Sequence, residues 1–92
     1  MKKRKINYKY DEDIILDELK RYVDSTYDKH YSHNKFQATE FVIDSGHGEG
    51  FCIGNILKYA QRYGRKNGKD RNDLLKVVHY GMIALYINDM EK

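Results

Sequence analysis

The last part of the chain, residues 70–90, constrains the fold most strongly, because a helix there would be apolar around most of its circumference. Asp70 can cap the start of this helix, and Asp73 follows three residues later in the pattern of an acidic capping box. The apolar positions are Leu74, Leu75, Val77, Val78, Met82, Ile83, Ala84, Leu85, Tyr86 and Ile87. Such a helix must be covered on several sides, and a chain of 92 residues has little material to cover it, so we expect self-association.

Three further helices and the segments that join them complete the predicted secondary structure. Apolar residues at helical spacing, with acidic residues in the first turn, predict a helix over residues 11–28. Asn67 and Gly68 form a strong turn signal before the last helix. The segments between are predicted as a polar connector over residues 30–34, a short helix over 36–45, a glycine-rich break over 46–50 and a third helix over 49–63. The predicted fold class is therefore all-α, a small bundle of three to four helices that is completed by oligomerisation into a homo-oligomer.

Length and charge divide the chain into two parts. Five positive charges precede the first acidic residue, Asp11, so residues 1–10 are predicted to be a basic tail and residues 11–92 a single helical domain. The single cysteine, Cys52, excludes an intramolecular disulfide and favours a reducing compartment. The sequence has no apolar run of about 20 residues and no signal-peptide pattern, so we expect a cytoplasmic protein without a membrane partner.

A second basic cluster lies between residues 58 and 76. Its positively charged members are Lys58, Arg62, Arg65, Lys66, Lys69, Arg71 and Lys76. On the third predicted helix, steps of three and four residues place on one polar face the side chains of Asn55, Lys58, Tyr59 and Arg62. The lysine and the arginine can hold phosphate oxygens, the asparagine can bind a base or a ribose, and the tyrosine offers a ring or a hydroxyl. The same spacing also fits a solvated basic helix face, so both interpretations stay open.

Other reactive groups give weaker signals. The glycines of residues 46–54 could expose backbone N–H groups to a phosphate, but the Gly-Lys-Ser/Thr ending of a P-loop does not follow them. His30 and His33 lie three residues apart, a spacing that is common by accident in a loop, so we expect no metal site. Cys52 has no Cys-x-x-Cys partner, and we expect a small buried thiol there rather than a nucleophile. No catalytic residue is assigned.

Several short motifs follow one another in a fixed order along about residues 28–86. They are His30-Tyr31, Glu40-Phe41-Val42-Ile43, Gly54-Asn55 with Lys58-Tyr59 and Arg62, a basic turn, and Asp73-Leu74-Leu75-Lys76 with Tyr80. This order resembles the SaV-like family of small tailed-phage proteins, which was long catalogued only as a domain of unknown function. Members of that family commonly have a proline just before the His-Tyr pair, whereas this chain has Asp28 and Lys29 there.

The resemblance implies a nucleotide ligand. A podophage member of the family is described as an unusual nucleoside monophosphate kinase, and other phage proteins of this size sequester the nucleotide signals of bacterial immunity. Together with the basic face, the resemblance places the phosphates at Lys58 and Arg62 and the base near His30, Tyr31 or Asn55. Further cations available to the phosphates are Arg65, Lys66 and Lys76.

We therefore expect a small phage-type nucleotide-binding protein in the cytoplasm of an infected bacterium. It would sequester a nucleotide signal without chemical change and would need no cofactor. One alternative is a nucleoside monophosphate kinase that uses the same basic face with ATP and Mg²⁺. Another is a nucleic-acid-binding protein that uses the basic tail and the 58–76 cluster, with a steep salt dependence. Because Lys58 and Arg62 lie on the predicted polar face, we expect both side chains to be dispensable for folding.

Overall fold

The computed structural model of the chain describes residues 5–28 and 32–91, with the backbone alone for residues 32–36. These residues form four α-helices and no strand. The helices are α1 (Glu12–Asp28), α2 (Ser32–Asp44), α3 (Gly48–Arg62) and α4 (Arg71–Met90). The prediction of a small all-α fold with three to four helices is confirmed. None of these four helices combines the length and the apolar character that crossing a membrane requires.

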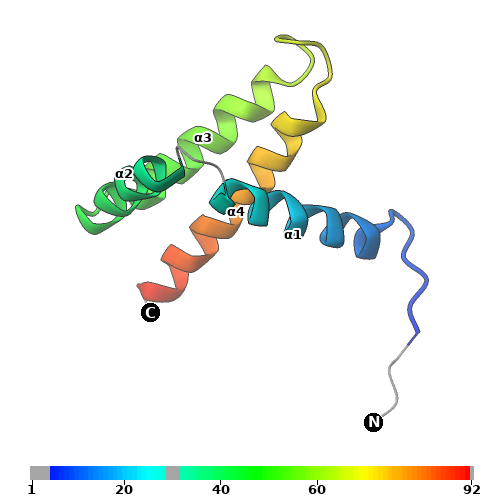
Figure 1. Cartoon of the computed structure of the whole chain (residues 1–92), viewed down its shortest axis with the longest axis horizontal. Helices are drawn as coiled ribbons and strands as arrows, with labels where there is room; N and C mark the ends of the chain where they lie inside the picture. The colour runs from blue at the N-terminus through cyan, green and yellow to red at the C-terminus, as the bar shows by residue number, and fades with distance from the viewer. Residues whose placement is uncertain (1–4, 29–31, 92) are drawn as a thin grey trace.

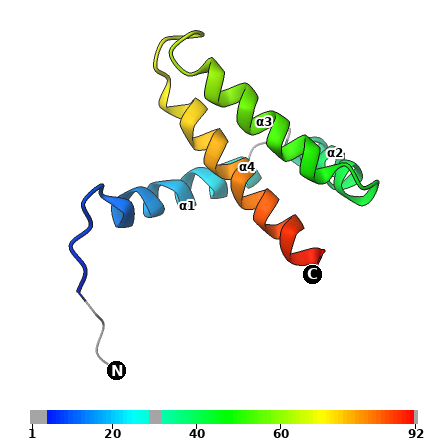
Figure 2. The same cartoon turned by 180° about the vertical axis from the view of Figure 1, so that it is seen from behind.

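The helices form an open arrangement. α3 and α4 lie side by side as an antiparallel pair, joined by the loop of residues 63–70 (Figure 1). α2 packs against α3, and α1 crosses α4 so that the N-terminal half of α1 projects away from the other helices (Figure 2). The radius of gyration is 15.4 Å, whereas a compact chain of this length would have about 12 Å. A single chain therefore leaves much of its helical surface uncovered.

Acidic side chains set where α1 and α4 begin. The carboxylate of Asp70 accepts a hydrogen bond from the backbone N–H of Asn72 at 3.0 Å, which confirms the predicted cap of α4. α1 begins at Glu12, one residue later than predicted, because Asp11 has a φ of 58° that does not fit a helix. The Glu12 carboxylate accepts a hydrogen bond from the backbone N–H of Tyr10 at 3.0 Å and so stabilises the bend that leads into α1.

Asp73 does not complete the capping box that its position predicts. Its backbone N–H donates to the carbonyl of Asp70 at 3.0 Å, but its carboxylate faces Arg62 of α3. The reason lies in the packing of the two helices, because α3 places a guanidinium beside this carboxylate in the buried space between them. Asp73 therefore links two helices instead of capping one.

The segment between α1 and α3 differs from its prediction in two ways. Residues 32–34 belong to α2 and not to a connector. Polar residues can form a helix, but without apolar residues at helical spacing the sequence pattern does not indicate one. The glycine-rich break is shorter than predicted, because α3 already begins at Gly48. Gly46 has a φ of 89° and donates its N–H to the carbonyl of Ile43 at 3.0 Å, so it ends α2 as C-terminal glycines commonly do.

The loop of residues 63–70 reverses the chain between α3 and α4. The N–H of Gly64 donates to the carbonyl of Gly68 at 2.9 Å, which closes the loop. Asn67 and Gly68 have φ values of 61° and 68°, so the predicted turn at these two residues is confirmed.

The buried core is small. Among the described residues its apolar members are Leu19 of α1, Cys52 of α3 and Ile87 of α4, and Cys52 has no exposed surface at all. The prediction of a buried thiol is confirmed, and burial raises the pKa of Cys52. Several of the apolar residues predicted to need cover on α4 stay exposed in the single chain, namely Leu74, Val78, Met82, Leu85 and Tyr86.

A bidentate ion pair ties α1 to the start of α4. The Arg71 guanidinium donates to both carboxylate oxygens of Glu18, with an Nε–Oε2 distance of 2.6 Å. This hydrogen bonding lowers the pKa of Glu18. One turn further along α1, the ring of Tyr22 meets the ring of His79 edge to face, with centroids 5.9 Å apart. These two contacts fix the angle at which α1 crosses α4.

Replacing Gly48 should destabilise the chain, because its missing side chain allows α3 to approach Ile87 and Ile43. A Cβ atom at Gly48 would lie 2.8 Å from Ile87 Cδ1 and 3.0 Å from Ile43 Cγ1. We expect Gly48→Ala to lower the free energy of unfolding by about 1–2 kcal/mol in urea denaturation, as overpacking does. The matched control is Gly54→Ala, where a Cβ meets nothing within 4 Å and better helix propensity should add up to about 1 kcal/mol. Equal effects of the two variants would contradict this account.

Cys52 should report on the opening of the α3–α4 interface. Because the thiol is buried and its pKa is raised, a thiol-specific reagent at mildly alkaline pH should react with the native protein only as fast as the protein opens. In concentrated guanidinium chloride the one thiol of the chain should react at once. Fast reaction of the native protein would show that the interface is not closed around Cys52.

Candidate functional site

Aromatic rings from three helices form a continuous layer beside the α3–α4 interface. Tyr59 of α3 and Tyr80 of α4 stack with their ring planes 11° apart and their centroids 6.1 Å apart. Phe51, about two turns earlier on α3, meets the Tyr80 ring edge to face, with the ring centroids 5.8 Å apart. Tyr22 and His79 extend the layer toward α1. The two tyrosines thus occupy the middle of a hydrophobic and polarisable platform.

Three cationic side chains gather around the ring of Tyr59. Lys58 Nζ lies 4.9 Å from the ring centroid, Arg62 Cζ 5.6 Å and Lys76 Nζ 5.7 Å. We call these four residues, Lys58, Tyr59, Arg62 and Lys76, the Tyr59 cluster. Cation–π attraction holds each charge near the ring, but the charges repel one another. In residues 5–28 and 32–91, neither lysine forms an ion pair with a carboxylate, so the cluster keeps a net positive charge.

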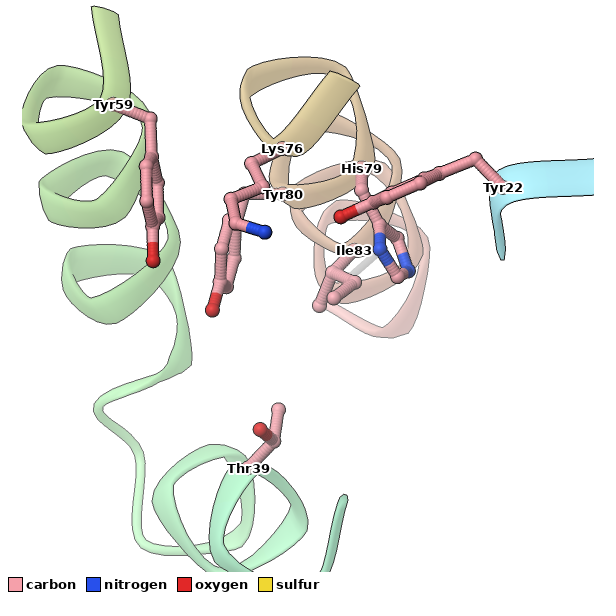
Figure 3. A pocket seen from close by; sticks show the side chains of 7 residues that line it. All are labelled: Tyr22, Thr39, Tyr59, Lys76, His79, Tyr80 and Ile83. Carbon is pink, nitrogen blue, oxygen red and sulfur yellow. The ribbon is translucent and has the colours of Figure 1, made fainter. Parts of the chain in front are cut away.

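The cavity beside the cluster is narrow. It is lined by Tyr22, Thr39, Tyr59, Lys76, His79, Tyr80 and Ile83, and its volume is about 20 Å³ (Figure 3). The hydroxyl groups of Tyr59 and Tyr80 point the same way, toward the side where Thr39 of α2 lies (Figure 3). A volume of this size has room for about one water molecule. A larger ligand would lie across the mouth of the cavity, beside Lys76.

Burial changes the acidity of Tyr80. Removal from water raises the pKa of its hydroxyl, and the neighbouring hydroxyl of Tyr59 and thiol of Cys52 raise it further. Tyr80 therefore stays neutral well above physiological pH. Its hydroxyl keeps its proton and can donate a hydrogen bond at the floor of the site.

Arg62 has a structural partner that the sequence did not reveal. Its Nε lies 3.6 Å from Oδ1 of Asp73, and Asp73 is only 2% exposed. Among the described residues, Arg62 Nε and Asp73 Oδ2 have no hydrogen-bond partner, so the pair is held by charge rather than by a close hydrogen bond. Arg62 therefore has a structural contact besides its place on the polar face, because its loss would leave a carboxylate buried without a cation. That the chain folds without this side chain stays a prediction. Lys58 is exposed, as expected.

The other predicted site residues are not gathered at the Tyr59 cluster. Asn55 donates its side-chain amide to the carbonyl of Phe51 at 2.9 Å, a hydrogen bond within its own helix. Arg65 and Lys66 are exposed on the loop after α3. Their backbone N–H groups donate to the carbonyl of Arg62 at 2.9 Å and 3.2 Å, but among the described residues no side-chain contact joins them to the cluster. His30 and Tyr31 lie outside the described residues.

Five residues that line the cavity were not predicted as site residues, namely Tyr22, Thr39, His79, Tyr80 and Ile83. Tyr22 and Ile83 belong to the apolar patterns of α1 and α4, and Tyr80 belongs to the order of motifs described above. Thr39 and His79 carry no signal of their own. No sequence signal could have found Tyr22 and Thr39, since each comes from a helix whose approach to α4 depends on tertiary packing. In the part of the chain that the structure describes, His, Cys, Asp and Glu side chains form no group of three that could hold a metal ion.

The chain matches a protein family over most of its helical part. A family model with the description "Protein of unknown function (DUF3310)" matches residues 25–81, which is more than half of the chain. The matched range contains the whole Tyr59 cluster, its partner Asp73 and the stacked Tyr80. The comparison with curated proteins and the comparison with solved structures give no match.

The ion pair between Arg62 and Asp73 should contribute to stability. We expect Arg62→Ala to lower the free energy of unfolding by about 1–3 kcal/mol, because Asp73 would stay buried without its cation. The matched control is Lys58→Ala, an exposed site on the same helix, which should change the stability by less than about 0.5 kcal/mol. The double variant Arg62→Ala/Asp73→Ala should recover part of the loss in a double-mutant cycle followed by circular dichroism. Equal stability of the two single variants would show that the pair is not structural.

Proposed function

We propose that this chain, which belongs to the DUF3310 family of proteins of unknown function, binds a nucleotide at the Tyr59 cluster. The observation that carries the proposal is the convergence of Lys58, Arg62 and Lys76 on one tyrosine ring. A phosphate group offers the negative charge that Lys58 and Lys76 lack, since Asp73 already offsets the charge of Arg62. Lysine and arginine are also the side chains that bind phosphate oxygens with charge-assisted hydrogen bonds.

The shape of the site supports a ligand with a flat group beside its phosphates. The cavity of about 20 Å³ is too small to enclose a base, since small-molecule pockets span about 300–1,000 Å³. The ligand would lie across its mouth, with phosphate oxygens at the lysines and the base toward the rings of Tyr22 and His79. Base-on-aromatic stacking of this kind is favourable for every base, so it supports nucleotide binding without selecting one base.

Within this proposal we favour sequestration over phosphoryl transfer. Asp73, the carboxylate that lies against the cluster, is buried and faces Arg62. A kinase has to hold Mg²⁺ with carboxylates that reach the phosphates, and a buried carboxylate that faces a guanidinium is poorly placed for this task. The order of motifs that resembles the SaV-like family supports the finer part of the proposal, which is a phage protein acting on a nucleotide signal in the cytoplasm of its bacterial host.

The proposal is tested by calorimetric titration of the full chain with mononucleotides, cyclic nucleotides and cyclic dinucleotides. Lys76→Ala should weaken binding about tenfold or more, because a charge-assisted hydrogen bond contributes about 1.5–3 kcal/mol. The matched control is Lys20→Ala, an exposed helical lysine paired with Asp24, which should bind as the parent does. Equal binding by Lys76→Ala and the parent would place the phosphate site elsewhere.

Chromatography of the same mixtures separates the alternatives. After incubation with ATP, Mg²⁺ and each nucleoside monophosphate, we expect all nucleotides to return unchanged. Formation of diphosphates that is lost in Lys76→Ala would support a kinase that uses the cluster. Binding of oligonucleotides with a steep salt dependence, together with no binding of mononucleotides, would instead support a nucleic-acid-binding protein.

A further inference from the structure

The side of α4 that faces away from α3 carries a continuous apolar stripe. Leu74, Val78, Met82 and Leu85 follow one another at steps of four, four and three residues, so their side chains lie along one side of the helix. Their exposed fractions are between 44% and 67%, which is high for four large apolar side chains in one line. The α1–α4 and α3–α4 contacts leave this side of the helix uncovered.

Gly81 lies in the same stripe, three residues after Val78 and four before Leu85. A Cβ atom at Gly81 would meet nothing within 4 Å, so the packing of this chain does not require a glycine there. A glycine in the middle of a helix weakens the helix unless something approaches its backbone closely. Here the space above Gly81 is open, and a second helix could enter it.

Two open grooves run along the two sides of the stripe. The groove between α3 and α4 has a volume of about 370 Å³ and includes Ile53, Gly81 and Leu85 in its lining. The groove between α1 and α4 has a volume of about 410 Å³ and includes Tyr27 and Met82. A ridge between two grooves is the surface that helices use when they pack ridges into grooves.

We propose that a second copy of this chain covers the stripe, with the two α4 helices antiparallel and a two-fold axis at the level of Tyr80. The sequence of α4 is self-complementary about this point. Val78 and Met82 are each two residues from Tyr80, and Leu74 and Tyr86 are each six residues away. A two-fold axis there brings Val78 against Met82 of the second copy and Leu74 against Tyr86, as an isologous interface requires.

The charges at the two ends of α4 favour the antiparallel direction. Arg71 and Asp89 are each nine residues from Tyr80, on the same side as the stripe. An antiparallel pair brings Asp89 of each copy toward Arg71 of the other, whereas a parallel pair would bring like charges together at both ends. The ion pair of Arg71 with Glu18 leaves most of the Arg71 side chain exposed to such an approach.

This interface does not rest on the proposed nucleotide site. The Tyr59 cluster lies where α4 faces α3, on the opposite side of α4 from the stripe. A variant that breaks the dimer should therefore keep the cluster intact, and the failure of one proposal leaves the other standing.

The first test is the mass of the full chain in solution, measured by light scattering. We expect twice the 11.0 kDa mass of one chain for the parent protein and the mass of one chain for Met82→Glu, with unchanged helical content by circular dichroism. The matched control is Leu57→Glu on the outer side of α3, where the leucine is 64% exposed, and this variant should stay dimeric. A monomeric parent, or a dimer that Leu57→Glu breaks and Met82→Glu does not, would overturn the proposal.

The second test reads the register directly and does not depend on how well Met82→Glu folds. Val78→Cys and Met82→Cys proteins are prepared separately and oxidised either alone or after subunit exchange in a mixture. The antiparallel register predicts a disulfide-linked dimer mainly in the mixture, and the buried Cys52 should not take part. Equal or stronger linkage of either protein alone would indicate a parallel or unrelated pairing, and no linkage in any sample would contradict the interface.

Discussion

The packing of α3 against α4 is the contact on which the other features of this chain depend. At one end, the missing side chain of Gly48 lets α3 approach Ile87 closely. In the middle, Cys52 is fully enclosed and the rings of Tyr59 and Tyr80 stack beside it. A close approach, a buried thiol and an aromatic stack thus follow one another along a single interface. α1 and α2 attach to this pair through fewer contacts, so their positions follow from it.

The same interface gathers positive charge. Lys58 and Arg62 are one turn apart on α3, and the antiparallel direction of α4 brings Lys76 to the same tyrosine ring. Asp73 offsets the charge of Arg62. Its carboxylate is buried, and without a cation beside it the buried charge would destabilise the chain. Lys58 is exposed and Lys76 is half-buried, and among the described residues neither forms an ion pair with a carboxylate. The packing of α3 against α4 is therefore what brings the three cations together.

Once one side of α4 is committed to α3, its other sides take on different roles. Lys76 and Tyr80 belong to the side that builds the cluster, and His79 meets Tyr22 of α1. Val78 and Met82 lie on the remaining side, where this chain provides no cover. This division explains how so small a chain can have an apolar helix and a charged site on the same element. It also explains the large radius of gyration, because helices with uncovered faces do not close into a compact bundle.

Local chemistry is what the sequence by itself determined. The four helical segments, the Asp70 cap, the turn at Asn67 and Gly68 and the burial of Cys52 were predictable, because each depends on neighbours within a few residues or on the apolar character of one position. It was also predictable that Lys58, Tyr59 and Arg62 share one face of α3, since helical spacing alone places them there.

Contacts between helices were decided only by the tertiary structure. Lys76 contacts the ring of Tyr59 from a position 17 residues later in the chain. Asp73, predicted to complete a cap, faces Arg62 because α3 lies beside it. Tyr22 and Thr39 enter the cavity lining from α1 and α2. The periodicity of one helix states which residues share a face, but not which helix that face meets. The distance, angle and direction of approach of two helices arise from the fit of their side chains in three dimensions.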